Sequence, residues 1–228
     1  MIQDTTIRGQ WSRGLQWVMA VTLPLIFLAV NVRLITSHRF VEWEYRRPGF
    51  PDDPFGLSTE ERIRLAQVCQ DYLASNADIS LLADLELPDG EPAFNERELR
   101  HMEDVQALYL GLTIAGVVGV VVWIGGGIAL GATGQLQGVV PGALVKGSLF
   151  TFGLLVAVGA FMLLDWGEFF TAFHRVFFEG DTWIFPPSDT LIRLFPIRFW
   201  IDVAAAIVAL VVAEATLTGV VGWIWGRS

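Results

Sequence analysis

Four long apolar stretches alternate with polar segments along the chain. They cover residues 15–35, 107–130, 145–164 and 200–225. Each is close to the roughly 20 residues that a helix needs to cross the hydrocarbon core of a bilayer. A helix suits that position because it satisfies its backbone hydrogen bonds internally. The pattern therefore predicts four transmembrane helices.

Two polar segments lie between the spans. Both follow an odd number of spans, so they share one side of the membrane. Residues 37–103 carry 15 acidic and 7 basic side chains, a net charge of −8. Residues 165–199 carry 5 acidic and 3 basic side chains. The remaining connection, residues 131–144, is uncharged and rich in glycine, which predicts a loop on the opposite side.

The first polar segment contains two signals for the start of a helix. Ser58 and Glu61 have the spacing of a capping box, and apolar residues recur after them at helical spacing. Asn95 and Glu98 repeat the signal. Neither proline nor glycine follows until residue 111, so we expect one continuous helix from residue 96 into the second span.

The second polar segment begins with a phenylalanine-rich run, residues 168–178. Aromatic side chains of this kind favour the depth of the lipid headgroups. The sequence therefore predicts an all-α membrane protein with four transmembrane helices, a mostly helical loop region over residues 37–103 and an interfacial aromatic helix within residues 165–199. We treat residues 1–228 as a single integral membrane domain.

Composition narrows the functional classes. Hydrophobic residues make up 53% of the chain and charged residues only 17%, whereas soluble domains carry about 25% charged residues. The net charge of −9 excludes a nucleic-acid binder that works by neutralising phosphates. Cys69 is the single cysteine, so no disulfide can form within the chain.

Two histidines are candidates for chemistry. His101 lies in the second turn of the helix that begins at residue 96, with Asp104 one turn later on the same face. His174 lies within the phenylalanine-rich run. Both are on one side of the membrane, and histidine suits general acid–base catalysis near neutral pH. The alternatives are a solvated helix start for His101 and a merely interfacial position for His174.

Other chemistry has weaker support. His101, Asp104, His174 and Asp181 could be imagined as metal ligands, but no spacing requires it, so we expect no metal and no cofactor. Glu214 lies near the middle of the fourth span. A carboxyl group at that depth is either functional or a protonated structural group, and the sequence does not name its partner.

Two blocks of sequence resemble the bacterial lipoprotein intramolecular transacylase (Lit) family. Residues 94–105 (FNERELRHMEDV) resemble a family stretch in which a glutamate precedes a histidine and an Asp-Val pair follows. The second block of this chain resembles a second block of that family. It consists of FHRVFF, WIF, DTLI and PIRFW at residues 173–178, 183–185, 189–192 and 196–200. The order and size of the spans and loops also match, so the resemblance covers most of the chain.

The resemblance implies an enzyme. It would move one acyl chain from the diacylglyceryl group of a lipoprotein's N-terminal cysteine to the α-amine of that cysteine, giving a lyso-form, N-acylated lipoprotein. The two family histidines match His101 and His174. Asp104 would then orient His101, and Arg175, Trp183 and Arg198 would contact a carbonyl or a headgroup. The expected partners are the diacylated lipoprotein and membrane lipid, and we expect a monomer.

Orientation rests on the same resemblance. Arginines near the first span, counted alone, favour an outside N-terminus, but long loops translocate largely regardless of charge. The resemblance implies a multi-pass protein of the bacterial cytoplasmic membrane with cytoplasmic N- and C-termini. Its active site would then lie at the outer leaflet.

Two other functional classes stay open on the sequence alone. The chain could be a non-catalytic membrane protein that binds a lipid or a partner through residues 37–103. It could also be a small transporter that uses Glu214. The second is disfavoured, because inverted repeats, which are common in transporters, are not visible.

Overall fold

The computed structural model describes residues 2–228, with side chains from residue 9 onward. Over that range the secondary structure is helical apart from an isolated β-bridge between Glu86 and Pro92. The helices are α1 (Ile2–Ile35), α2 (His38–Tyr45), α3 (Thr59–Ser75), α4 (Ser80–Ala83), α5 (Glu96–Ala132), α6 (Leu136–Leu164), α7 (Trp166–Phe177), α8 (Thr190–Leu194) and α9 (Ile197–Trp225).

Four of the described helices are long and apolar enough to cross a membrane, which confirms the predicted class. They are Gly9–Ile35 within α1, Glu96–Ala132, Leu136–Leu164 and Ile197–Trp225. All charged residues of α5 lie between Glu96 and Asp104. We therefore take the first turns of α5, which hold His101, as the part that precedes the membrane-crossing segment.

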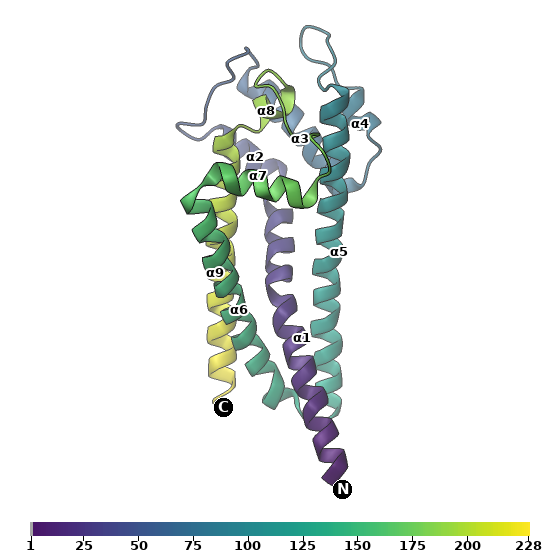
Figure 1. Cartoon of the computed structure of the whole chain (residues 1–228), viewed down its shortest axis with the longest axis vertical. Coiled ribbons are helices and arrows are strands. Elements are labelled where there is room, and N and C mark those ends of the chain that lie inside the picture. Colours follow the sequence, from purple (N-terminus) through teal and green to yellow (C-terminus); the bar gives the residue numbers. More distant parts are fainter. Residues whose placement is uncertain (1) are drawn as a thin grey trace. The chain divides into compact units, whose positions relative to one another are not determined.

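The chain forms two compact units. The bundle unit comprises Met1–Asn31, Leu112–Leu164 and Ile207–Ser228, and the polar unit comprises Val32–Gly111 and Asp165–Ala206. Within the bundle unit, stretches of α1, α5, α6 and α9 run side by side (Figure 1). Glycines allow the close approach: a Cβ added at Gly116 of α5 would lie 2.5 Å from the Cβ of Ala29 in α1.

Polar side chains inside the bundle unit bond to one another across helices. Asn31 of α1 is fully buried, and its Nδ2 donates a hydrogen bond of 2.7 Å to Oε2 of Glu214 in α9. Ser148 of α6 and Thr218 of α9 are 3.0 Å apart. The partner of Glu214 that the sequence did not identify is therefore an amide on another span.

One predicted boundary is wrong. Residues 131–144 were expected to form a loop, but α6 begins at Leu136 and contains Pro141 near its start. The segment carries no charged side chain, and the polar backbone of a chain within a membrane is stable only where its hydrogen bonds are made internally. The helix therefore starts earlier than the glycine content indicated.

The polar unit is built around α3. The side chains of Leu65, Cys69 and Tyr72 are almost completely buried and pack with residues from α4, α5 and α8. On the adjoining face, Ile63 and Ala66 pack with Val41 and Tyr45 of α2 and Phe199 of α9. The predicted helical spacing of the apolar residues after Ser58 is thus confirmed.

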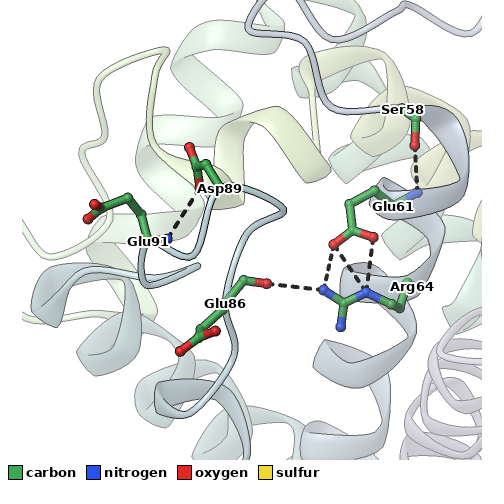
Figure 2. A network of polar contacts seen from close by, with 6 residues as sticks. All are labelled: Ser58, Glu61, Arg64, Glu86, Asp89 and Glu91. Carbon is green, nitrogen blue, oxygen red and sulfur yellow. Dashed lines mark hydrogen bonds and ion pairs between the residues drawn. The ribbon is translucent and has the colours of Figure 1, made fainter.

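The start of α3 also holds a loop in place. Ser58 Oγ accepts a hydrogen bond of 3.1 Å from the Glu61 N–H, which confirms the predicted cap. The Glu61 carboxylate binds Arg64, whose Nη2 donates to the Glu86 carbonyl at 3.2 Å (Figure 2). Asp89 accepts from the Glu91 N–H in the same loop. The cap of α3 therefore anchors the loop that precedes α5.

Candidate active site

The helix cap at Asn95 fixes the start of α5. Asn95 Oδ1 accepts from the Glu98 N–H at 3.1 Å, and Glu98 Oε2 accepts from the Asn95 N–H at 2.9 Å. This is the reciprocal capping box that the sequence predicted. It places His101 in the second turn of α5, with its side chain only 9% exposed.

Helix α7 presents the second histidine. Asp165 Oδ1 caps the helix by accepting from the Glu168 N–H at 3.0 Å. The side chain of His174 faces inward and is 8% exposed, while Phe173, Val176 and Phe177 are exposed. A short helix with a wide apolar outer face is typical of the membrane interface, as the sequence predicted.

The two imidazoles lie next to each other within the polar unit. Their ring centroids are 6.0 Å apart and their planes differ by 21°. The residues are separated by 72 positions in the sequence, so the fold alone brings them together. The contact joins the polar start of α5 to α7 (Figure 1).

Aromatic side chains surround both rings. Phe178 lies 4.9 Å from the ring of His101 and 5.3 Å from that of His174. Phe185 adds a contact of 5.3 Å to His101, and Trp183 one of 5.0 Å to His174. We call this group, together with Phe170, the aromatic enclosure. It excludes water from the histidines without supplying a charge.

Burial makes both imidazoles weaker bases than an exposed histidine. Desolvation, together with a smaller contribution from the repulsion of His174, lowers the pKa of His101 to about 4. Desolvation also lowers the pKa of His174, opposed by its hydrogen bond to a backbone carbonyl. Both rings are therefore neutral at neutral pH, and the pair accepts one proton far more readily than two.

The tautomer of His174 follows from that hydrogen bond. Its Nδ1 lies 2.7 Å from the Phe170 carbonyl oxygen, which can only accept. The neutral ring thus carries its proton on Nδ1 and a lone pair on Nε2. The residue four positions earlier in the same helix sets the chemistry of the histidine.

The predicted role of Asp104 is contradicted by its contacts. Asp104 is exposed and accepts a hydrogen bond from Thr182 at 3.5 Å, whereas the buried Nδ1 of His101 has no hydrogen-bond partner among the described residues. A carboxylate beside that nitrogen would itself be desolvated by the aromatic enclosure. It turns to solvent instead, although the helical spacing is favourable.

The other three candidates have different positions. Trp183 contacts His174, and its indole N–H donates to the Gly180 carbonyl at 3.1 Å. Arg175 is exposed beside His174 on α7. Arg198 was expected to contact a carbonyl or a headgroup, but it pairs with Asp202 at 2.5 Å and is not among the contacts of the histidines. Within the described residues, no three His, Cys, Asp or Glu side chains come together to hold a metal.

Sequence reasoning took Glu98 only as a capping residue. Its side chain is 1% exposed, and Oε1 accepts from the Leu191 N–H of α8 at 2.7 Å. Arg97 pairs with Asp189 at 2.8 Å and lies over the Phe185 ring at 5.6 Å. These contacts tie residues 185–191 to α5 one turn before His101. The spacing Glu-x-x-His could have indicated that Glu98 lies beside the site, because residues three positions apart share one face of a helix.

The first prediction concerns the buried Glu98 carboxylate. Glu98→Ala leaves the N–H groups of Asn95 and Leu191 without their acceptor, and each such group costs about 1–3 kcal/mol. We expect a loss of about 2–4 kcal/mol in the free energy of unfolding of the purified protein, measured by denaturant titration. Glu98→Gln keeps one acceptor oxygen and should lose less.

Glu96→Gln is the matched control for this measurement. The Glu96 side chain is 92% exposed and lies 3.9 Å from Arg100, so its replacement should change stability by less than about 0.5 kcal/mol. Equal effects of Glu96→Gln and Glu98→Ala would contradict the role given to the buried carboxylate.

The second prediction concerns pH. An unfolded histidine binds a proton near pH 6.5, whereas folded His101 binds one only at about pH 4. Between these values the unfolded state holds more protons, so acidification destabilises the fold. His101→Phe removes this effect and keeps an aromatic ring in the enclosure. The stability advantage of the wild type over this variant should therefore shrink by about 1–3 kcal/mol from pH 7 to pH 4.

The measurement is the free energy of unfolding of both proteins across that pH range. The comparison isolates one group, because carboxyl groups whose pKa is raised, such as that of buried Glu98, titrate in both proteins. A difference that stays constant with pH would mean that the folded protein does not keep His101 neutral.

Comparison with known proteins places the chain in a family. A family model described as lipoprotein intramolecular transacylase Lit matches residues 17–200. A protein of Aquifex aeolicus (strain VF5), described as uncharacterized, is 32% identical over 185 residues, which is 81% of this chain and 82% of that protein.

Solved structures share the fold. The in meso structure of the membrane-integral lipoprotein intramolecular transacylase Lit from Bacillus cereus has a TM-score of 0.79 at 20% identity, over 96% of this chain and 97% of that chain. A form of the same protein with one histidine mutated to alanine has a TM-score of 0.77 at 19% identity, over 98% and 97% of the two chains. Since the family model covers well over half of the sequence, the chain belongs to the lipoprotein intramolecular transacylase (Lit) family of membrane acyltransferases.

Proposed function

We propose that His101 and His174 together carry the acyl transfer of this enzyme. The observation that supports the proposal is the pair of neutral, buried imidazoles 6.0 Å apart. The substrate is a lipoprotein whose N-terminal cysteine bears a diacylglyceryl group. The α-amine of that cysteine attacks an ester carbonyl carbon of the same group. A C–N bond forms, and the C–O bond to the glyceryl oxygen breaks.

The proton balance of this reaction closes within the pair. The attacking nitrogen must lose a proton, and the departing glyceryl oxygen must gain one. One imidazole accepts the proton from the nitrogen and, as an imidazolium, returns it to the departing oxygen, so the enzyme ends in its starting state. No covalent acyl-enzyme is needed, which agrees with the lack of a Gly-x-Ser-x-Gly nucleophile motif in the sequence.

The tautomers assign the two roles. His174 has its Nδ1–H bonded to the Phe170 carbonyl, so its Nε2 lone pair is the base. The Nδ1 of His101 is buried without a partner, and an unpaired N–H is rarer in proteins than an unpaired acceptor. We therefore assign the His101 proton to Nε2. From there it can donate a hydrogen bond to the oxyanion of the tetrahedral intermediate, while protonated His174 returns its proton to the leaving oxygen.

The lowered pKa values restrict the step at which the base acts. A free α-amino group has a pKa near 8, and burial lowers the pKa of His174 below that of an ordinary histidine. This ring is therefore too weak a base to take a proton from an ammonium group efficiently. The neutral amine attacks first. Its nitrogen becomes strongly acidic once bonded to the carbonyl carbon, and His174 removes the proton then. Attachment of both reacting groups to one cysteine supplies much of the acceleration.

The surroundings suit an acyl substrate. The exposed apolar residues of α7, Phe173, Val176 and Phe177, would contact lipid chains, with Trp183 beside the reacting carbonyl and Arg175 positioned for a headgroup. Lipoproteins mature outside the cytoplasmic membrane, so the polar unit lies at the outer leaflet and both termini are cytoplasmic. Both histidines come from one chain, so a monomer is sufficient.

The third prediction tests the histidines. His174→Ala and His174→Gln should both lower the rate of N-acylation by about 10²–10⁴-fold, because neither replacement is a base of suitable pKa. His101→Gln keeps an N–H donor, so its rate of N-acylation should be at least about 10-fold higher than that of His101→Ala. The rate is measured by mass spectrometry of the N-terminal peptide of a diacylated lipoprotein incubated with each purified variant.

His38→Ala is the matched control. His38 is exposed and its Nε2 lies 2.8 Å from Asp71 Oδ1, so its loss should leave the rate unchanged. Full activity in His101→Ala and His174→Ala would refute the assignment. It would instead favour acyl transfer by other groups of this chain. A wild type without N-acylation activity would favour a binding role through residues 37–103.

The fourth prediction tests orientation. Asp89 and Thr133 are exposed and lie in connections expected on opposite sides of the membrane. In intact cells, a membrane-impermeant maleimide should label Asp89→Cys, whereas Thr133→Cys should react only after permeabilisation. The natural Cys69 is buried and gives little background. The reverse labelling pattern would place the N-terminus outside.

A further inference from the structure

The outer face of α2 carries a row of residues that the acyl-transfer site does not use. Arg39, Glu42, Trp43 and Arg46 have the spacing i, i+3, i+4 and i+7, which places them on one face of the helix. All four are exposed. The opposite face carries Val41, Glu44 and Tyr45, which are buried in the polar unit. Helix α2 therefore has one face fixed by packing and one face free.

The free face forms an open pocket of about 480 Å³. We call it the α2 arginine pocket. It holds three guanidinium groups and one carboxylate, so its charge is positive, whereas residues 37–103 as a whole have a net charge of −8. The lining residues are Arg39, Glu42, Trp43, Arg46, Arg47 and Pro48.

Few internal contacts neutralise these arginines. Arg39 makes no ion pair among the described residues. Arg46 lies 3.6 Å from Glu42, but both side chains are 55% exposed, and exposed pairs contribute little. Other arginines of the polar unit are engaged by the fold: Arg62 donates to the Pro51 and Arg193 carbonyls, and Arg193 pairs with Asp53 at 3.0 Å. Two charges of the pocket are thus available to a ligand.

The third guanidinium is held in position. Arg47 donates to Glu44 Oε2 at 2.9 Å, lies 3.5 Å from Asp202 and stacks over the Trp43 ring at 4.8 Å. Trp43 is nevertheless 57% exposed. An ordered arginine next to an exposed tryptophan combines a phosphate ligand with a ring that favours headgroup depth.

Chain connectivity keeps α2 near the lipid. Helix α1 spans the membrane and ends at Ile35, and α2 begins only three residues later, at His38. Arg39 and Arg46 are two turns apart, about 10 Å along the helix axis, and their long side chains can converge on one tetrahedral group between them. Guanidinium groups bind phosphate oxygens in a bidentate manner.

We propose that the α2 arginine pocket binds the phosphodiester of an anionic phospholipid headgroup from the surrounding leaflet. Arg39 and Arg46 contact the phosphate oxygens, Arg47, paired with Glu44, holds the Trp43 ring in place, and Trp43 packs against the glycerol region. This site is separate from the two histidines, and it would orient the protein at the headgroup layer whether or not the histidine assignment holds.

The fifth prediction tests this site by binding. The full chain, purified in a mild detergent, is titrated with phosphatidylglycerol, and the apparent Kd is read from the rise in melting temperature. Each arginine near a membrane surface contributes about 1 kcal/mol. Arg39→Gln/Arg46→Gln should therefore bind roughly 30-fold more weakly, and each single variant about 5-fold. Both side chains are exposed, so the variants should fold, which circular dichroism checks.

Three controls decide the outcome. Arg13→Gln/Arg100→Gln removes the same charge from exposed positions elsewhere and should leave the Kd unchanged. Phosphatidylcholine should raise the melting temperature only slightly. Inorganic phosphate at about 10 mM should not reproduce the rise seen with phosphatidylglycerol, because it lacks the glycerol and acyl groups that hold the lipid at the surface. Equal weakening in both double variants, equal shifts with both lipids, or a full shift with free phosphate would each overturn the proposal.

Discussion

A bilayer supplies no hydrogen-bond partners to the groups that cross it, and this constraint determines most of the structure. It explains why α6 starts at Leu136 although the preceding residues are rich in glycine. It also explains why the buried Asn31 of α1 and Glu214 of α9 bond to each other at 2.7 Å. Hydrogen bonds between helices therefore help to hold the bundle unit together, in addition to the close helix approach at Gly116.

The aromatic enclosure applies a related constraint to the chemistry. Removal of water makes a proton on either imidazole costly, so the resting pair is neutral and ready to accept one. A nearby carboxylate such as Asp104 would raise the basicity of His101, but only with the cost of its own desolvation. The enclosure instead uses a backbone carbonyl, that of Phe170, which orients His174 without adding a charge. Proton transfer and a lipid-facing position are thus compatible in one small site.

Much of the fold and part of the site could be predicted from the sequence. Apolar length and capping signals are local, so the four spans, the cap at Ser58 and the continuous helix from Asn95 through His101 were accessible. The contacts that involve other segments were not. Helical spacing offered Asp104 as the partner of His101, but solvation decided otherwise. The hydrogen bond from the Leu191 N–H to Glu98 depends on tertiary packing that no pattern in one sequence specifies. The Arg198–Asp202 pair, in contrast, has the local i, i+4 spacing of a helix.

A hydrogen bond joins His174 to the Phe170 carbonyl, and a ring contact joins it to Phe178. The two residues lie four positions before and four positions after the histidine. Every helical residue carries a carbonyl, so an insertion before His174 would only exchange one backbone acceptor for another. An insertion after His174 would instead rotate the Phe178 ring by about 100° relative to the histidine. The enclosure therefore depends on the length of the interval between the histidine and the phenylalanine four positions later, whereas the orientation of the ring by the main chain does not depend on which residue supplies the carbonyl.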